Sequence, residues 1–177
     1  AGADRLYGHS EDLAAPGDDS AADRLFGETD PDSPPDPSAP VGAAASDLLY
    51  GQGGDDHLEG GGADDTLEGG LGNDELRGDA GNDLLRGGQG SDTVYGGSGD
   101  DVLFGGTEDD RLFGDAGRDL LYGEDGADEL VGGLDDDTLR GGAGDDLLRG
   151  QQGDDLLFGA DGNDQLLGDA GNDALYG

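Results

Sequence analysis

An apolar residue recurs at every ninth position from Leu58 to Leu175, and mostly polar or glycine residues separate these positions. The residue is leucine in every unit but one, which has Val94. Successive side chains of an extended segment point to opposite faces, so each x-Leu-x segment predicts a short three-residue strand with leucine inward. One inward side chain per unit makes a thin core. Such units must stack on one another, which is typical of a solenoid.

The six residues before each of these strands read Gly-x-x-Gly-x-Asp, and the first glycine recurs every nine residues from Gly51 to Gly168. We number the nine positions of a unit from this glycine. Glycine adopts positive φ at little cost, so we expect all six residues to form the turn. The strings GDAGND and GDAGRD begin at Gly78, Gly114 and Gly168, at multiples of eighteen residues. Two units therefore form one coil, which predicts an all-β solenoid of about seven regular coils.

An aspartate occupies the sixth position of every unit. Stacked coils would bring each one beside the aspartate eighteen residues later, at the roughly 4.8 Å spacing of neighbouring strands. Carboxylates at that distance repel unless a cation lies between them. The chain has no cysteine and two histidines, so oxygen ligands and a hard cation are indicated, and calcium suits irregular turns better than magnesium. The candidate ligands are Asp56, Asp65, Asp74, Asp83, Asp92, Asp101, Asp110, Asp119, Asp128, Asp137, Asp146, Asp155, Asp164 and Asp173, which pair into up to about twelve Ca²⁺ sites.

The units GDAGNDLLR (78–86), GGQGSDTVY (87–95) and GGAGDDLLR (141–149) resemble the haemolysin-type, or RTX, calcium-binding nonapeptide repeats. The resemblance implies a right-handed parallel β-roll in which calcium lies between successive turns, held by sixth-position aspartates and turn carbonyls. It also implies an extracellular location, because proteins with such repeats are secreted, typically by bacteria. They cross the envelope unfolded through type I secretion and fold outside on binding calcium.

The charge of the chain agrees with calcium-induced folding. Eight arginines stand against 44 acidic residues, a formal net charge of −36. A chain of this composition should be disordered until cations bind, so that folding and binding are one event. The same charge would repel nucleic acid. No apolar run approaches the length of a membrane span, and no cleavable signal peptide is recognisable.

Three units depart from the pattern at the fourth position, where Ala63, Glu108 and Asp135 replace glycine. We expect these turns to be strained or reshaped. Glu108 and Asp135 allow two interpretations: each adds a carboxylate to a cation site, or each marks a degenerate repeat with a poor or empty site.

The outward positions predict a difference between the two sheets. The residues just before the inward leucines of one sheet are mostly polar, from His57 to Gln165. The other sheet should carry an apolar stripe, interrupted by Arg86 and Arg140, that contains Leu84, Val102, Phe104, Leu120, Tyr122, Leu156 and Phe158. Such a stripe indicates packing against a second copy, the N-terminal segment or other parts of a parent protein. The alternative is that these are ordinary cross-strand pairs tolerated on the surface.

The N-terminal part divides from the repeats. We expect residues 47–177 to form the calcium-binding roll and residues 1–46 to form a degenerate, repeat-like segment. ADRLYG (3–8) and ADRLFG (22–27) repeat the end of the unit, and the intervening EDLAA (11–15) is a candidate for the opposite strand of one irregular coil. Five of the six prolines lie in residues 30–40, which predicts a loop.

Two classes of function remain. The chain has no recognisable catalytic motif around its two histidines, and its periodic carboxylates are explained by calcium, so we expect no enzyme in this segment. The leading hypothesis is a calcium-binding structural module of a secreted protein that assists export. The alternative is an extracellular adhesive or ligand-binding module that uses the apolar outer sheet as its contact face.

Overall fold

The computed structural model describes residues 5–7, 24–26 and 46–177, and strands are the only regular elements among them. No helix in these residues could cross a membrane. One sheet contains β1 (Arg5–Tyr7), β3 (Leu48–Gly53), β5 (Thr66–Leu71), β7 (Leu84–Gln89), β9 (Val102–Thr107), β11 (Leu120–Asp125), β13 (Thr138–Ala143), β15 (Leu156–Asp161) and β17 (Ala174–Tyr176). The other contains β2 (Arg24–Phe26), β4 (His57–Gly62), β6 (Glu75–Ala80), β8 (Thr93–Ser98), β10 (Arg111–Ala116), β12 (Glu129–Leu134), β14 (Leu147–Gln152) and β16 (Gln165–Ala170).

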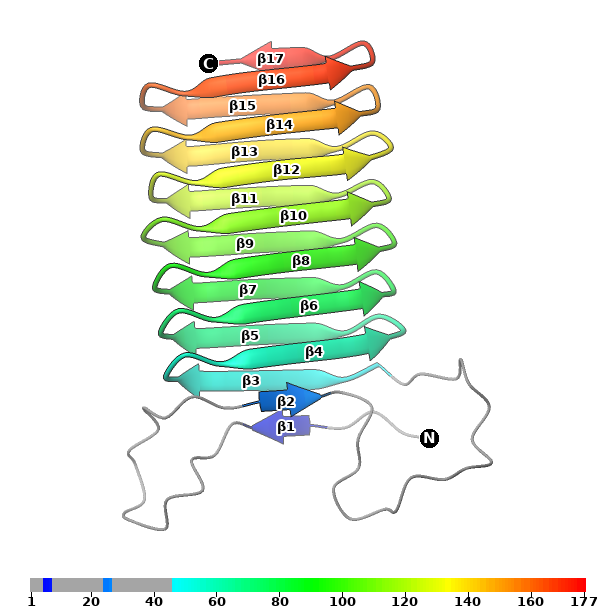
Figure 1. The fold of residues 1–177 in the computed structure, drawn as a ribbon, viewed down its shortest axis with the longest axis vertical. Coiled ribbons are helices and arrows are strands. Elements are labelled where there is room, and N and C mark those ends of the chain that lie inside the picture. The colour runs from blue at the N-terminus through cyan, green and yellow to red at the C-terminus, as the bar shows by residue number, and fades with distance from the viewer. Residues whose placement is uncertain (1–4, 8–23, 27–45) are drawn as a thin grey trace.

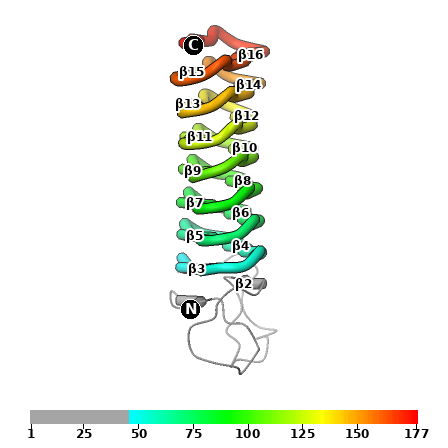
Figure 2. Tube along the Cα trace, turned by 90° about the vertical axis from the view of Figure 1, so that its left-hand side faces the viewer, coloured from blue at the N-terminus to red at the C-terminus, as the bar shows by residue number. Residues whose placement is uncertain are grey.

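The chain winds as a right-handed coil, so that consecutive strands alternate between a nine-stranded and an eight-stranded sheet (Figure 1). The two sheets form two facing layers when seen from the side (Figure 2). All neighbouring strands are parallel, and from β3 onward each residue pairs with the one eighteen positions later, as Leu112 does with Leu130. The predicted all-β parallel β-roll with eighteen residues per coil is confirmed.

The strands are longer than the sequence pattern predicted. Each regular strand has six residues rather than three, and includes the first three positions of the next unit, as in β9 (Val102–Thr107) with Gly105 and Gly106. The turn is correspondingly short, because only the fourth to sixth positions remain. Glycine is a poor strand former by itself. These segments are extended because each one pairs on both sides with a neighbouring coil in the same register.

The core is one row of side chains between the two sheets. The inward residues from Leu49 to Leu157 are fully buried, and Leu166 packs partly against the end of the row. The residues on either side of each leucine face outward, which gives the alternating burial expected of a strand. Each coil therefore supplies two core residues, and no coil buries its leucines without its neighbours.

Positive φ occurs at two positions of every unit from 51 to 176: the second, which lies within the strand, and the fourth, which begins the turn. The Gly-x-x-Gly motif indicated the first and the fourth positions, but the first-position glycines have no positive φ. The three substituted fourth positions keep the glycine-like conformation, with φ of 80° at Ala63, 75° at Glu108 and 74° at Asp135. These turns are thus strained rather than reshaped, because residues with a Cβ adopt positive φ at a cost.

The strands near the N-terminus add to both sheets. β1 pairs with β3 and β2 pairs with β4, with Leu6 opposite Leu49 and Leu25 opposite Leu58. The opposite strand of this first coil is therefore Arg24–Phe26. The predicted opposite strand at 11–15 and the proline-rich loop at 30–40 lie outside the described residues.

A core substitution tests the one-row architecture. Leu112 is fully buried between β8 and β12, so Leu112→Ala should lower the free energy of unfolding by about 2–5 kcal/mol. Leu134 is 43% exposed, and Leu134→Ala should change it by no more than about 0.5 kcal/mol. Urea unfolding of both variants under identical ionic conditions measures the difference. Equal losses would contradict a core made of the inward row alone.

Candidate metal centre

The sixth-position aspartates form two ladders, one along each edge of the roll where the turns stack. The first ladder contains Asp56, Asp74, Asp92, Asp110, Asp128, Asp146 and Asp164. The second contains Asp65, Asp83, Asp101, Asp119, Asp137, Asp155 and Asp173, and begins one coil earlier with Asp47. All fourteen predicted residues thus lie beside their neighbours one coil away.

One oxygen of each ladder carboxylate holds the preceding coil. The backbone N–H of Asp92 donates to Asp110 Oδ1 at 2.8 Å, and the same bond recurs between each aspartate and the one eighteen residues later. These bonds join turns in the way that ladder hydrogen bonds join strands. The side chain that was predicted only as a ligand therefore links the coils of the fold by a hydrogen bond.

The other oxygen of these carboxylates is buried without a partner. In the described residues, eleven ladder aspartates from Asp65 to Asp155 have an Oδ2 that accepts no hydrogen bond, although the residues are only 1–3% exposed. A buried polar atom without a partner is costly, and a buried charge is more so. Two continuous rows of such oxygens therefore call for a positively charged partner.

The first-position glycine leaves an oxygen-lined cradle next to each Oδ2. A Cβ added at Gly60 would lie 2.6 Å from Asp65 Oδ2 and 3.0 Å from the carbonyl oxygen of Gly78 in the next coil. The same two kinds of oxygen surround the corresponding point at most other first positions. Glycine is therefore required here for space, and the space is lined by carboxylate and carbonyl oxygens.

Oxygen-only donors fit a hard cation such as calcium. In residues 46–177 no group of three or more acidic, histidine or cysteine side chains is arranged to hold a metal ion, so carbonyl oxygens would have to complete each coordination shell. Those of the fourth and fifth positions accept no backbone N–H bond in this part of the chain. Two ladder carboxylates and free turn carbonyls thus supply the donor set that calcium prefers.

The comparison with known families agrees with this geometry. The family model described as the RTX calcium-binding nonapeptide repeat matches residues 41–76, 68–103, 77–111, 104–139, 131–166 and 140–175. The chain belongs to this family. No match is found among curated proteins. The RTX repeats of this β-solenoid fit a calcium-binding repeat module, and their matched range begins before Asp47.

Two features of the RTX ladders were not predicted. Asp47 was missed because no Gly-x-x-Gly turn precedes it, although its spacing of nine residues from Asp56 and the Leu-Leu-Tyr-Gly after it were visible. The fifth-position residues form an outer, exposed row that holds the following coil, since Asp154 Oδ1 accepts from the backbone N–H of Asn172 at 2.8 Å. Fifth and sixth positions therefore link turns in opposite directions.

Burial dominates the electrostatics of the inner ladders. Desolvation, reinforced by neighbouring carboxylates, raises the pKa of Asp110 and Asp137 to about 8 and that of Asp119 to about 6. The other resolved ladder groups shift in the same direction. In the outer row, a backbone N–H bond from the following coil lowers the pKa of Asp145 and Asp154. The carboxylates whose ionised form is destabilised by burial thus lie in the two sixth-position ladders and not in the outer row.

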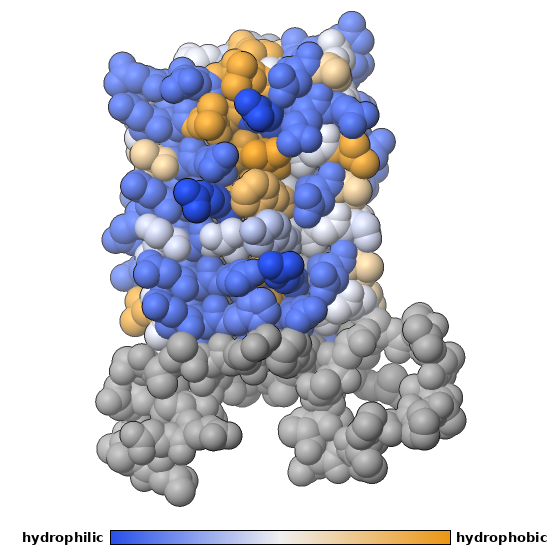
Figure 3. All heavy atoms as spheres, viewed as in Figure 1, coloured by the Kyte–Doolittle hydropathy of each residue, from blue (hydrophilic) through white to orange (hydrophobic). Residues whose placement is uncertain are grey.

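Both outer faces carry aromatic pairs, and this corrects the prediction of one polar sheet. On the nine-stranded sheet, Phe104 stacks on Tyr122 with ring centroids 5.0 Å apart. On the eight-stranded sheet, Tyr95 stacks on Phe113 at the same distance. Apolar side chains gather in the middle and upper part of that face (Figure 3). The prediction failed because, for the eight-stranded sheet, it considered only the column before the inward leucines, whereas it considered both columns for the other sheet.

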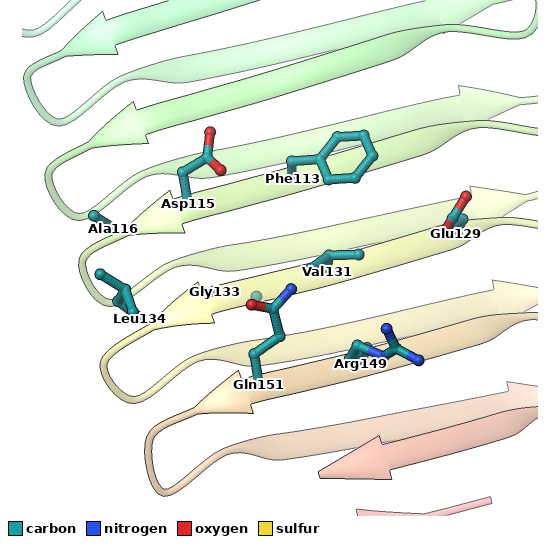
Figure 4. Close-up of a pocket in the computed structure, with 10 residues that line it drawn as sticks. Phe113, Asp115, Ala116, Glu129, Val131, Gly133, Leu134, Arg149 and Gln151 are labelled. Atoms are coloured by element: carbon teal, nitrogen blue, oxygen red, sulfur yellow. The ribbon is translucent and has the colours of Figure 1, made fainter. Parts of the chain in front are cut away.

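A shallow hollow lies on the eight-stranded face across β10, β12 and β14 (Figure 4). Phe113 and Val131 line its floor together with Glu129 and Arg149. Glu129 forms an ion pair with Arg111 at 3.4 Å, and Arg149 forms one with Asp169 at 3.4 Å. Both charged groups of the hollow therefore have partners on neighbouring strands. It contains no nucleophile paired with a base.

The raised pKa values predict an unusual pH dependence for the cation-free roll. Burial raises the pKa of the ladder carboxylates from Asp65 to Asp137 to about 6 to 8 in the fold, against 3.8 for an exposed aspartate, so the folded state binds more protons in this range. Their contribution to stability is complete below about pH 4 and is lost as the pH rises through 6 to 8. Calcium-free protein should therefore gain β signal in circular dichroism when the pH falls from 8 to 5. Greater stability at pH 8 than at pH 5 without metal would contradict the burial of these groups.

Proposed function

We propose that this chain is the calcium-binding repeat module of a secreted bacterial protein, disordered without calcium and folded after binding it outside the cell. Its role is structural and assists export, and it carries out no catalysis itself. The observation that carries the proposal is the pair of ladders in which buried Oδ2 atoms lack a partner. Membership of the RTX calcium-binding repeat family supports the choice of cation.

In this proposal the sixth-position aspartates of adjacent turns bind the same ion, and turn carbonyls complete its shell. Bound calcium would supply positive charge where the fold buries carboxylates. The ladders then couple binding to folding, because Asp119 faces both Asp101 and Asp137 only when three coils are stacked. A chain with net charge −36 that is exported before it meets millimolar calcium would remain unfolded until then.

A calcium titration followed by circular dichroism tests this function. Wild type should change from coil to β structure at roughly 0.1–1 mM Ca²⁺ at pH 7.5, the affinity range of extracellular modules, and Mg²⁺ should substitute poorly. Asp119→Asn keeps an oxygen for the Asp101 N–H bond but removes the buried charge, so it should raise the calcium midpoint several-fold.

The matched control is Asp109→Asn. Asp109 also accepts one backbone N–H bond across a coil, from Ala127, but it is an exposed fifth-position residue. Its midpoint should stay close to that of wild type. A well-folded wild type in excess chelator at pH 7.5, or equal shifts for both variants, would refute the ladder as the binding site.

The second candidate function is a contact face on the nine-stranded sheet. The predicted stripe residues lie on its outer surface, where Phe104 and Tyr122 stack and Leu120 is 38% exposed. Arg86 and Arg140, which were expected to interrupt the stripe, lie over the rings of Phe104 and Phe158. We propose that a second copy of the chain covers this stripe, since two identical flat faces are complementary in shape and the stripe is apolar.

Light scattering with saturating calcium tests self-association. We expect the mass of a dimer for wild type and of a monomer for Phe104→Ser. Tyr95→Ser changes the equivalent column of the opposite sheet and should leave the dimer intact. A monomeric wild type at concentrations of tens of micromolar would contradict self-association through this stripe and leave the calcium-binding proposal unaffected.

A further inference from the structure

The outward column after the inward leucines contains stacked rings on both faces, but on the eight-stranded face the stack is interrupted. Each residue of this column pairs in register with the next, and the column reads Arg77, Tyr95, Phe113, Val131 and Arg149. Arg77 lies over the ring of Tyr95, 4.8 Å from its centroid, and Tyr95 stacks on Phe113 at 5.0 Å. The stack of rings thus ends at Phe113, whose other face is turned toward Val131.

Valine leaves the next level of the stack empty. Its side chain ends at Cγ and cannot reach the height of the rings, and the hollow of about 520 Å³ lies over it. Figure 4 shows Phe113, Val131 and Arg149 in one column, with the short side chain of Val131 in the middle. Arg149 pairs with Asp169 in the following coil, which directs its charged end away from Val131. Two strand spacings, roughly 9.6 Å, separate Phe113 from Arg149, and this leaves room for one ring.

The same column of the nine-stranded sheet has no such gap. From position 86 onward it contains only arginine and aromatic residues, namely Arg86, Phe104, Tyr122, Arg140, Phe158 and Tyr176. Its two arginines lie over rings at 5.2 and 5.4 Å, and its rings stack in pairs. The empty level over Val131 is therefore a local feature of one face and not a property of the repeat.

Polar groups border the hollow on both sides of Val131. Figure 4 shows Glu129 on one side of Val131 and Gln151 on the other, with Asp115 beside Phe113. Glu129 pairs with Arg111 through Oε2, and its second carboxylate oxygen can accept a further hydrogen bond, as can the amide oxygen of Gln151. The lining holds two carboxylates and one arginine in a chain of net charge −36, so it disfavours an anionic ligand.

We propose that the hollow over Val131 binds a small, planar, uncharged heteroaromatic molecule that carries an N–H donor. Its ring stacks on the open face of Phe113 at the level that valine leaves empty, and its N–H donates to an acceptor at the border of the hollow. Ring stacking and burial of apolar surface favour binding, and the volume is typical of small-molecule sites. The hollow lies outside the two aspartate ladders, so this inference goes beyond the proposed function and requires only the folded roll.

Titration of the folded full chain with indole, in the presence of CaCl₂, tests this site. In ¹⁵N NMR spectra, indole should shift the amide signals of Phe113, Val131 and Gly133 with a Kd of roughly 0.1–1 mM, as expected for so small a ligand. 1-Methylindole lacks the N–H donor and should bind about three- to tenfold more weakly. Indole-3-acetate is an anion and should also bind more weakly than indole.

Three variants separate the site from general adhesion to an apolar surface. Val131→Phe fills the empty level with a ring of the protein, so it should abolish indole binding while leaving the roll at least as stable to urea as wild type. Phe113→Leu keeps an apolar floor but removes the stacking face, and it should weaken indole binding about fivefold. The matched control is Phe104→Leu, which removes the equivalent ring on the opposite face and should leave the affinity for indole unchanged.

The outcomes distinguish this inference from the calcium-binding proposal. A folded wild type whose amide signals do not move with indole, or move equally on both faces, would overturn the site over Val131. Indole binding that persists in Val131→Phe would overturn it as well. Neither result bears on the calcium midpoint, and a wild type that folds without calcium would refute the calcium proposal while the indole titration still tests the hollow.

Discussion

The fold depends on burying two rows of carboxylates at the edges of a stack of coils. The buried sixth-position aspartates from Asp65 to Asp155 each use one oxygen to accept a backbone hydrogen bond from the preceding coil, and the other oxygen accepts none. The hydrogen bond favours stacking of the coils. The buried oxygen without a partner opposes stacking whenever the carboxylate is ionised. The leucine row adds only two side chains per coil. In the proposed function, a cation at the ladders would therefore decide whether the stacked state is stable at neutral pH.

Glycine has two separate physical functions in the unit. At the second and fourth positions the backbone has positive φ, and residues such as Gln151 and Glu124 are tolerated there at a cost. At the first position the conformation is ordinary but a Cβ would collide with the ladder carboxylate of the same unit. The first position is accordingly glycine in every unit from 51 to 176, whereas the other two vary.

Periodicity predicted most of the fold because every coil has the same residue types at the same positions and therefore folds in the same way. The inward leucines, the eighteen-residue register and the stacked aspartates all follow from spacing. Strand length did not, because residues such as Gly105 have little tendency to extend and do so only between two paired neighbours. Asp47 was missed since its turn lacks the motif. The reach of Glu108 to Gly90 could not be predicted, because it depends on the side-chain path across a coil.

The constant offset of eighteen residues has a consequence for folding. A coil that paired with the wrong neighbour, one full turn away, would still bury leucine against leucine and align aspartate with aspartate. The repeating interactions thus stabilise the stack without specifying which coil follows which. Only irregular contacts identify the correct partner, such as Arg118 with Asp100 or Tyr95 with Phe113. These departures from the repeat stabilise one alignment of the coils over several others of nearly equal energy.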